Sequence, residues 1–400
     1  MTNEFKYIIV GGGLAGASAV EGIRERDHIG TIALFAKEDR LPYDRPPLSK
    51  GLWTGKAKLE DLPIHDDAFY SSHNVHLHRN TEVMELHPAM HQVLDANGNR
   101  YTYEKLLMAT GGTPRRLQFG EEALHYFRTV DDYLCLRKEA DKAQEFIVIG
   151  GGFIGSELAA ALTMNNKKVT MVFPDETLLR RVLPADLSSF VTEYYRSKGI
   201  TILNNDEPVA AERSNHNTTV ITKSGKRISG DVAIVAIGLD LGIGIAESAG
   251  LKVGNGIVVN NLLQSSDHDV YATGDVAYFP AKSLDKNIRI EHWNNAQAQG
   301  RHAGQNMAGA NRPFEYLPYF YSDLFDLGFE AVGELDSRME TYAEWKEKYR
   351  EGVVYYLDNG RVKGVLLWNV WENVDAARRI IDLKKMYQST DELRGTLPFA

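Results

Sequence analysis

The chain of 400 residues contains a single cysteine, Cys135, and no apolar run long enough to span a bilayer. One cysteine excludes a disulfide framework and a redox-active pair of the Cys-x-x-Cys kind. The formal net charge of −9 argues against general binding to nucleic acid or anionic membranes. The first residues show no pattern of a secretory signal. We therefore expect a cytoplasmic protein, with Cys135 as a small buried residue.

Two glycine-rich segments of the same pattern stand out in a composition that is otherwise ordinary for a globular protein. They are "KYIIVGGGLAGASAVEGI" near the start and "EFIVIGGGFIGSELAAAL" at 145–162. Each has an apolar run, then Gly-x-Gly-x-x-Gly, then small helix-favouring residues, which is the order strand, tight turn, helix. Such a turn lets the backbone approach a pyrophosphate, and the helix N-terminus receives the phosphate charge. The repeat predicts two dinucleotide-binding domains.

An acidic residue is expected at the end of the second strand of each unit, where it binds ribose hydroxyls. Glu38 and Asp175 lie about 20 residues after the last glycine of their turns, as the motif requires. An acid at Asp175 favours NAD(H), because it would repel a 2′-phosphate. Arg180 and Arg181 are near enough to keep NADP(H) open as an alternative.

The remaining chain supports two nucleotide domains and a third domain. Buried strands that end in glycine turns are predicted at 232–240 and 269–279, and a helix is predicted at 292–309. The carboxylate in the Gly274-Asp275 turn could reach a polyol chain. From about residue 315, strands precede one helix, and "LDNGRV" carries an Asn-Gly hairpin signal.

The chain also contains, in this order, "PYDRPPLSK", "VIGGGFIGSELAAAL", "YATGD" and "EHWNNAQAQ". Together these segments resemble the FAD-dependent ferredoxin and rubredoxin reductases. The later segments "YSDL" and "GVVYYLDNGRVKGVLLWNV" resemble the apoptosis-inducing factor branch. The resemblance implies an α/β fold with two Rossmann-like, glutathione-reductase-like dinucleotide-binding domains and a C-terminal α+β domain. It implies an FAD-binding domain at 1–114 and 243–314, an NAD(H)-binding domain at 115–242, and a C-terminal domain at 315–400.

The resemblance also implies which residues bind each cofactor. For FAD they would be Gly11, Gly13, Leu14, Ala15, Gly16, Glu38, Arg45, Lys50, Val83, Arg128, Asp275, His292 and Trp293. For NAD(H) they would be Gly152, Phe153, Ile154, Gly155, Glu157, Asp175, Gly238 and Glu330. Tyr321 would stack on flavin or nicotinamide.

Two positions depart from the family pattern. Lys37 stands where relatives have an acid, so the adenosine ribose is assigned to Glu38. Tyr321 stands where relatives often have tryptophan, which keeps an aromatic ring but weakens the expected stacking.

Lys50 and Glu157 are the predicted catalytic pair. Reduced flavin carries negative charge, which a fixed cation and a helix N-terminus stabilise. Lys50 could supply the cation, and a helix that begins near Trp293 could supply the dipole. Family geometry would pair Lys50 with Glu157, which we expect in the first turn of the second glycine-turn helix. Without the resemblance, a surface lysine and a helix glutamate would be the simpler interpretation.

Two functions follow from these patterns. One is an FAD-dependent NADH oxidoreductase that passes electrons to a small carrier such as a ferredoxin or rubredoxin, or to a small-molecule acceptor. The other is a redox sensor like apoptosis-inducing factor, in which a long-lived flavin–NAD complex controls partner binding or dimerisation. A monomer or a homodimer fits either function. We expect no metal site, since His76 and His78 lack further convergent ligands.

Overall fold

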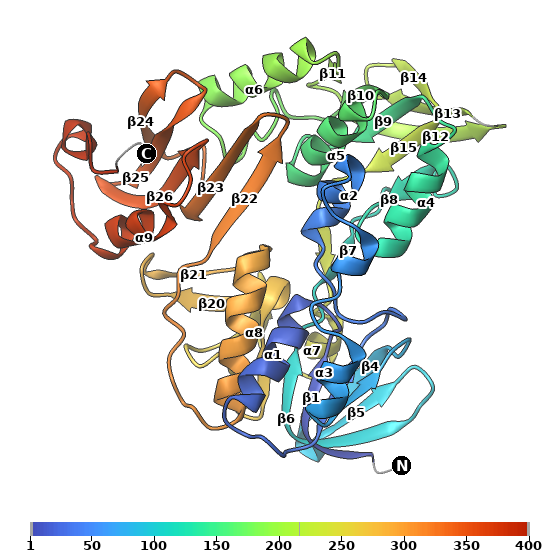
Figure 1. Ribbon diagram of the computed structural model, residues 1–400, viewed down its shortest axis with the longest axis vertical. Helices are drawn as coiled ribbons and strands as arrows, with labels where there is room; N and C mark the ends of the chain where they lie inside the picture. The colour runs from blue at the N-terminus through green and yellow to red at the C-terminus, as the bar shows by residue number, and fades with distance from the viewer. Residues whose placement is uncertain (1–2, 216, 398–400) are drawn as a thin grey trace. The chain divides into compact units, whose positions relative to one another are not determined.

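The computed structural model describes residues 3–215 and 217–397 (Figure 1). The chain divides into two compact units, each assembled from three segments. Unit 1 comprises Met1–Asp44, Glu60–Thr113 and Asp240–Pro318. Unit 2 comprises Arg45–Leu59, Pro114–Leu239 and Tyr319–Ala400. Each unit therefore carries one of the two glycine-rich turns.

Unit 1 is built on a seven-stranded sheet of order β3-β2-β1-β6-β5-β4, in which β19 also pairs with β6. The pairs β3–β2, β2–β1, β1–β6 and β6–β19 are parallel, whereas β4 and β5 add an antiparallel edge. The strands are β1 (Glu4–Val10), β2 (Ile32–Phe35), β3 (Val75–His78), β4 (Val83–His87), β5 (Gln92–Asp95), β6 (Arg100–Met108) and β19 (Val270–Ala272). The central strands are buried apolar runs, as parallel strands covered by helices must be.

Helices α1 (Leu14–Arg24) and α8 (Trp293–Met307) lie side by side in unit 1 (Figure 1). Their backbones approach closely because glycines occupy the contact. A Cβ atom on Gly304 would lie 2.2 Å from the carbonyl oxygen of Ala19. The helix predicted at 292–309 is therefore confirmed, with a packing reason for its small residues. The other elements of this unit include α3 (Asp67–Ser72), η3 (Pro88–Met90), α7 (Gly244–Ser248), β17 (Val253–Gly254), β18 (Gly256–Val258), η4 (Gly274–Val276), β20 (Ala277–Ala281) and β21 (Lys286–Ile288).

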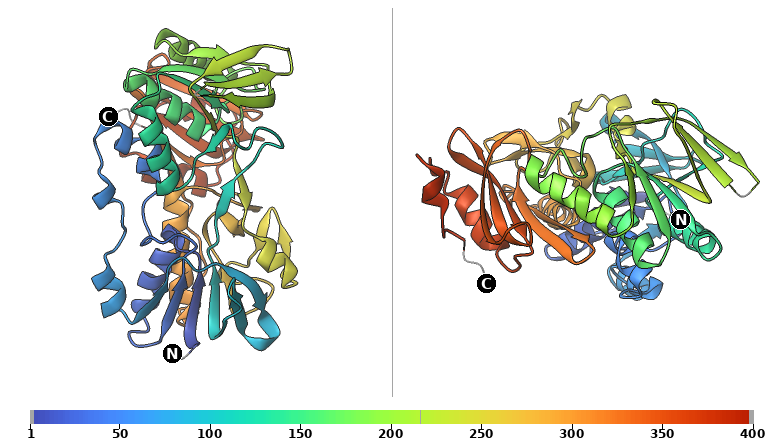
Figure 2. Two further views of the ribbon diagram at one scale, coloured as in Figure 1. Left: turned by 90° about the vertical axis from the view of Figure 1, so that its right-hand side faces the viewer. Right: turned by 90° about the horizontal axis from the view of Figure 1, so that it is seen from above.

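Unit 2 contains a five-stranded sheet of order β11-β10-β9-β15-β8, whose strands are all parallel. A small antiparallel sheet of β12, β13 and β14 packs against it over an apolar core that includes Ile147, Val220 and Val235 (Figure 2). The strands are β8 (Leu124–Tyr126), β9 (Glu145–Ile149), β10 (Lys168–Val172), β11 (Thr201–Leu203), β12 (Pro208–Ser214), β13 (Asn217–Thr222), β14 (Arg227–Gly230) and β15 (Val232–Val235). The helices are η1 (Pro46–Ser49), α2 (Gly51–Thr54), α4 (Val130–Ala140), α5 (Phe153–Met164) and α6 (Ala185–Ser197).

The end of the chain forms an antiparallel sheet of order β22-β23-β26-β25-β24 followed by α9 (Val374–Asp382), drawn in orange and red in Figure 1. Its strands are β22 (Tyr319–Leu324), β23 (Leu327–Gly333), β24 (Glu340–Glu347), β25 (Glu351–Asp358) and β26 (Arg361–Trp368). Asn359 and Gly360 join β25 to β26 with positive φ of 50° and 73°, as the Asn-Gly hairpin signal predicted. Short strands β7 (Gly112–Pro114) and β16 (Leu239–Leu241) lie where the chain passes between units.

The observed elements confirm the predicted α/β class, with two parallel sheets that each follow the strand, glycine turn, helix order and a C-terminal sheet domain. Within residues 3–215 and 217–397, no helix is both long and apolar enough to cross a membrane.

Candidate functional site: two nucleotide turns and a buried ion pair

The first glycine turn joins β1 to α1 in unit 1. Gly11 has φ of +130°, and a Cβ atom there would lie 2.0 Å from the carbonyl oxygen of Ala109. A Cβ atom on Gly16 would lie 2.2 Å from the carbonyl oxygen of Gly11, so both positions need glycine. Gly13 caps α1, and a Cβ atom there would meet nothing within 4 Å. The open space in front of the helix N-terminus, beside the amides of Leu14 and Ala15, fits a pyrophosphate.

The second glycine turn repeats this geometry between β9 and α5 in unit 2. Gly150 has φ of +123°, and its Cβ atom would lie 2.2 Å from the carbonyl oxygen of Ala236. A Cβ atom on Gly155 would lie 2.2 Å from the carbonyl oxygen of Gly150. Gly152 caps α5 and again has nothing within 4 Å of its Cβ position. Two cradles of the same kind therefore fit two dinucleotides.

The residues after the second strand of each unit lie as follows. Lys37 forms an ion pair with Glu82, its Nζ 2.9 Å from Oε1, and this pair is largely exposed. Glu38 accepts a hydrogen bond of 2.6 Å from the hydroxyl of Tyr43, which orients its carboxylate. Asp175 follows β10 and is half-buried. Glu38 and Asp175 therefore both stand at the carboxyl ends of parallel strands, where ribose is bound in this class of fold.

Gly274, which precedes Asp275, lies between helices α1 and α8 of unit 1. The Cβ position of Gly274 is 3.3 Å from that of Ala15 in α1 and 3.8 Å from that of Ala296 in α8. The buried amide of Gly274 donates to Oε1 of Gln299 at 2.9 Å. Asp275 is thus carried to the first glycine turn, as an FAD-binding residue would be.

Other predicted FAD-binding residues have fixed surroundings. The indole N–H of Trp293 donates to Oδ1 of Asp44 at 2.6 Å, which holds the start of α8, and His292 caps that helix. Val83 is buried in β4. In unit 2, Nη1 of Arg45 donates to the carbonyl oxygen of Arg128 at 2.8 Å.

Lys50 and Glu157 form the predicted ion pair within unit 2, with Nζ 2.8 Å from Oε1. The Lys50 side chain is 17% exposed and that of Glu157 is 4% exposed. Burial lowers the pKa of Lys50, but the charge of Glu157 and its hydrogen bond outweigh burial, so the pKa is raised above its usual value. Lys50 is therefore a permanent cation at neutral pH.

Glu157 is the fifth residue of α5, in its second turn, and the expectation of a first-turn carboxylate is wrong. The helix begins at Phe153, directly after the glycine cap, so the residues near the dipole end are Phe153 and Ile154. The negative charge of Glu157 is therefore compensated by the ammonium group of Lys50 and not by the N-terminus of α5.

One aromatic ring lies next to this pair, and two others pack together on the same elements. Nζ of Lys50 lies 4.7 Å from the ring centroid of Tyr321, which is 37% exposed. Phe153 packs edge-on against Phe320, with ring centroids 5.6 Å apart. An exposed Tyr321 ring beside a cation offers a face on which a planar ligand can stack.

Three further residues predicted for the NAD(H) site, Glu330, Gly238 and Ile154, differ in burial and in hydrogen bonding. Glu330 in β23 is half-buried, and desolvation raises the pKa of its carboxyl. Its Oε2 is buried without a hydrogen-bond partner among the described residues, so it can accept a bond from a ligand. The carbonyl oxygen of Gly238 accepts from the amide of Arg115 at 2.9 Å. The side chain of Ile154 is 42% exposed.

The sequence prediction missed Ser49 and Ser322. Their hydroxyls donate to Oε2 and Oε1 of Glu157, each at 2.7 Å. Ser49 lies next to Lys50, and Ser322 lies next to Tyr321, within the segments "RPPLSK" and "YSDL". Their place in these motifs was the only signal, since a lone serine carries no pattern of its own.

Cys135 is exposed, which corrects the expectation that it is buried. In α4 the buried side is formed by Val130, Tyr133, Leu136 and Ala140, and Cys135 faces away from it. Its thiol lies near His125 and Glu139. An oxygen of Glu139 also lies 3.2 Å from Nε2 of His125 and 4.0 Å from Nη2 of Arg213.

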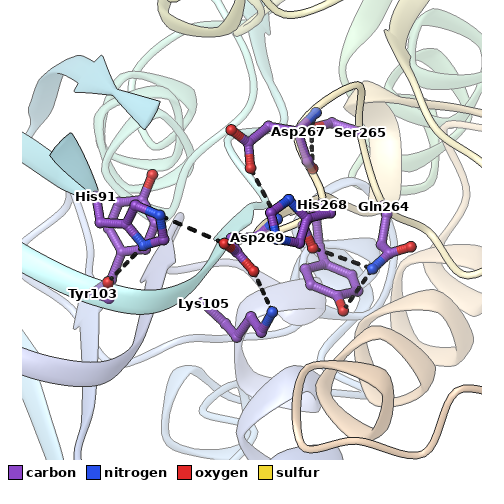
Figure 3. A network of polar contacts seen from close by, with 9 residues as sticks. His91, Tyr103, Lys105, Gln264, Ser265, Asp267, His268 and Asp269 are labelled. Carbon is purple, nitrogen blue, oxygen red and sulfur yellow. Dashed lines mark hydrogen bonds and ion pairs between the residues drawn. The ribbon is translucent and has the colours of Figure 1, made fainter. Parts of the chain in front are cut away.

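A second polar cluster surrounds Asp269 in unit 1 (Figure 3). Asp269 is 8% exposed and pairs with Lys105 of β6. Nε2 of His91 lies 3.5 Å and Nε2 of His268 lies 3.2 Å from its Oδ2. Burial alone would raise the pKa of Asp269. The hydrogen bond and the charge of Lys105 lower it by more, so the pKa lies below its usual value. This cluster joins β6 to the loop before β19.

Residues 5–300 match the family model described as "Pyridine nucleotide-disulphide oxidoreductase". The chain belongs to this family. The oxidoreductase also matches "Apoptosis-inducing factor, mitochondrion-associated, C-term" over residues 303–347 and 342–383. Members of the family bind FAD and NAD(H), and this chain is an NAD(P)H-dependent flavoprotein oxidoreductase. Its single cysteine rules out the dithiol chemistry in the family name.

Similar proteins cover nearly the whole oxidoreductase. Apoptosis-inducing factor 1, mitochondrial, of Dictyostelium discoideum is 34% identical over 99% of this chain and 82% of that protein. Putidaredoxin reductase CamA of Pseudomonas putida is 33% identical over 91% of this chain and 89% of that protein. The crystal structure of the covalent putidaredoxin reductase–putidaredoxin complex gives a TM-score of 0.90 at 31% identity, covering 96% of this chain and 94% of that one.

Proposed function

We propose that this oxidoreductase takes electrons from NADH onto bound FAD and passes them to a small electron-carrier protein such as a ferredoxin or rubredoxin. The observation that carries the proposal is the buried Lys50–Glu157 pair beside the second glycine turn. The likeness to putidaredoxin reductase over most of both chains supports a protein carrier as the acceptor. A small-molecule acceptor stays the alternative destination for the electrons.

The two glycine turns supply the dinucleotide sites in this proposal. In unit 1, the amides after Gly13 would hold the FAD pyrophosphate, while Glu38 and Asp275 would bind its hydroxyl groups. In unit 2, the turn at Gly152, with Asp175 and Glu330, would hold NADH. Bound FAD would supply a ring system that can take up a hydride and give up electrons one at a time.

Lys50 has the central role among the side chains. Its ammonium group stays charged at neutral pH and is held by Glu157 in a largely water-excluded position. A fixed cation stabilises the negative charge that develops on an accepting ring, at no cost of reorganisation during the reaction. Pro46 and Pro47 restrict the backbone of the segment that presents it.

We propose that Asp175 of unit 2 favours NADH over NADPH. Asp175 places a negative charge at the end of β10, where a 2′-phosphate would be repelled. Nη1 of Arg180 donates to Oγ of Ser337 at 3.0 Å. This contact gives one guanidinium nitrogen of Arg180 a partner within unit 2, and NADPH stays the alternative because Arg180 and Arg181 both lie near Asp175 in sequence.

A second candidate function is an NADH sensor like apoptosis-inducing factor. The C-terminal match over residues 303–383 favours it. NADH would give its hydride to the flavin, and the resulting NAD+ would stay bound beside the reduced flavin in a long-lived complex that changes partner binding or dimerisation. A long-wavelength absorption band that persists for minutes in air would favour the sensor, and decay within seconds would exclude it.

The deciding experiment is anaerobic reduction of the purified holoenzyme by NADH or NADPH, followed by mixing with a panel of acceptors. We expect NADH to bleach the flavin absorbance faster than NADPH. An oxidised ferredoxin or rubredoxin should then restore it faster than oxygen does. If reduction occurs but no protein carrier accelerates reoxidation, the proposed acceptor is wrong. The cytoplasmic location, the oligomeric state and the domain bounds stay predictions.

A further inference from the structure

Three donors from two segments of the chain converge on the Glu157 carboxylate of α5 within unit 2. Oε1 accepts from Nζ of Lys50 at 2.8 Å and from Oγ of Ser322 at 2.7 Å, while Oε2 accepts from Oγ of Ser49 at 2.7 Å. Ser322 comes from β22, Ser49 from η1, and Glu157 from α5. Both hydroxyls are nearly inaccessible to water, since Ser322 is 1% and Ser49 is 3% exposed.

We propose that Ser322, assisted by Ser49, is a positioning residue that fixes the Glu157 carboxylate and thereby aims Lys50 for the reaction. The proposal deepens the function proposed above and rests on it. Ser322 touches neither NADH nor FAD in this account. It acts through Glu157.

The geometry explains why the ion pair alone is insufficient. A lysine ammonium is a point charge on a flexible stem with three rotatable donors, so it does not orient a carboxylate by itself. Ser49 and Ser322 each direct a hydroxyl at a different carboxylate oxygen, which fixes the rotation of the carboxylate plane. Hydrogen bonds to an ionised acceptor are stronger than neutral ones, and a buried carboxylate that loses one is costly to keep in place.

The other charged and titratable groups around the pair are few. Tyr321 and Asp323 on β22 raise the pKa of Lys50. Burial, with a smaller contribution from the charge of Glu157, raises the pKa of Tyr195 in α6. Burial lowers the pKa of Lys50, while the charge of Glu157 is the largest influence that raises it. If the carboxylate turns away, that attraction weakens and Lys50 should lose its proton at lower pH.

The test compares Ser322→Ala, Ser322→Thr and the control Ser156→Ala in the holoenzyme. Ser156 is adjacent to Glu157 and fully buried, and its hydroxyl has no hydrogen-bond partner within the described part of the chain. Stopped-flow reduction by NADH separates the limiting reduction rate from the NADH dissociation constant. We expect Ser322→Ala to lower the rate by about 10-fold, the loss of one charged hydrogen bond, with a smaller change in NADH affinity. Ser322→Thr keeps a hydroxyl and should recover most of the rate.

A readout independent of turnover is the pH titration of the oxidised flavin absorbance without NADH. Loss of the Lys50 proton should perturb this spectrum, and the alkaline transition should move to lower pH in Ser322→Ala but not in Ser156→Ala. Equal behaviour of these two variants in both measurements would overturn the proposal. If Ser322→Ala cannot hold FAD, Ser49→Ala decides in its place, with the same shift expected and the same control. If NADH does not reduce the wild-type holoenzyme, the proposed function fails. If NADH reduces the wild type and Ser322→Ala behaves like Ser156→Ala, only the positioning role of Ser322 fails.

Discussion

Asp175 lies three residues after the end of β10. Its carboxylate carries a negative charge where the ribose of a nicotinamide dinucleotide is proposed to bind. A carboxylate accepts hydrogen bonds from the ribose hydroxyls and repels a phosphate in their place. The proposed preference for NADH over NADPH can therefore be tested at Asp175.

Replacement by Asp175→Ala should raise the KM for NADH by about 10-fold, because a charged hydrogen bond contributes roughly 1.5–3 kcal/mol. The KM for NADPH should stay the same or fall, since the repulsion is removed. Steady-state kinetics with both nucleotides check this, with the exposed neighbour Glu176→Ala as the control. An equal loss with NADH and NADPH would show that Asp175 does not recognise the ribose.

At the scale of elements, the Asp269 cluster shows how a buried charge connects β6 to the loop before β19 (Figure 3). β19 leads directly to Gly274 and Asp275, so the cluster supports the segment proposed to reach FAD. The pKa of Asp269 is lowered in the folded protein, because the effect of Lys105 exceeds the opposing effect of burial. Because the pKa of Asp269 is lower in the folded state, its ionised form stabilises the fold at pH values above the unfolded-state pKa of about 3.9. This stabilisation is lost as the pH falls through the folded-state pKa.

We therefore expect Asp269→Asn to destabilise the protein at pH 7 by roughly 3 kcal/mol, since it leaves Lys105 without its buried partner. The difference in melting temperature from wild type should shrink as the pH is lowered below about 4. Thermal unfolding across pH measures both effects. Asp39→Asn is the matched control, because Asp39 is 78% exposed and 3.9 Å from Arg79. A difference that does not change with pH would refute the electrostatic origin.

For the whole molecule, each unit is assembled from three separate segments of the chain and carries one dinucleotide turn. A ligand that binds only the folded state stabilises it by mass action, by about 2.7 kcal/mol at a free concentration of 100 times the dissociation constant. Removal of FAD should therefore lower the melting temperature, and added FAD should restore it together with the yellow colour. Differential scanning calorimetry of apo and reconstituted protein checks this. An unchanged melting temperature would mean that FAD is not held by the folded chain.

Short-range patterns were sufficient to predict much of this molecule. Each glycine turn lies between a strand and a helix only a few residues apart, and the Asn359-Gly360 hairpin is set by two residues. The helix at Trp293–Met307 could be predicted from its run of small and polar residues that ends at a glycine, and the close approach of Gly304 to α1 explains why those residues are small.

Long-range contacts were beyond the sequence. Glu157 meets Ser49 and Ser322 across 108 and 165 residues of chain, and no local pattern encodes such a meeting. The position of Glu157 within α5 was misjudged because the helix starts directly after the glycine cap. The exposure of Cys135 depends on which side of α4 packs, and its own residue type favoured the wrong choice.

The most direct test of the account is stopped-flow reduction of the flavin by NADH in Lys50→Ala, with the exposed lysine variant Lys56→Ala as control. We predict that the limiting reduction rate falls by about 10²-fold in Lys50→Ala, the usual loss when one preorganised electrostatic group is removed, while the NADH dissociation constant changes far less. An unchanged reduction rate with weaker NADH binding would contradict the role assigned to the buried cation.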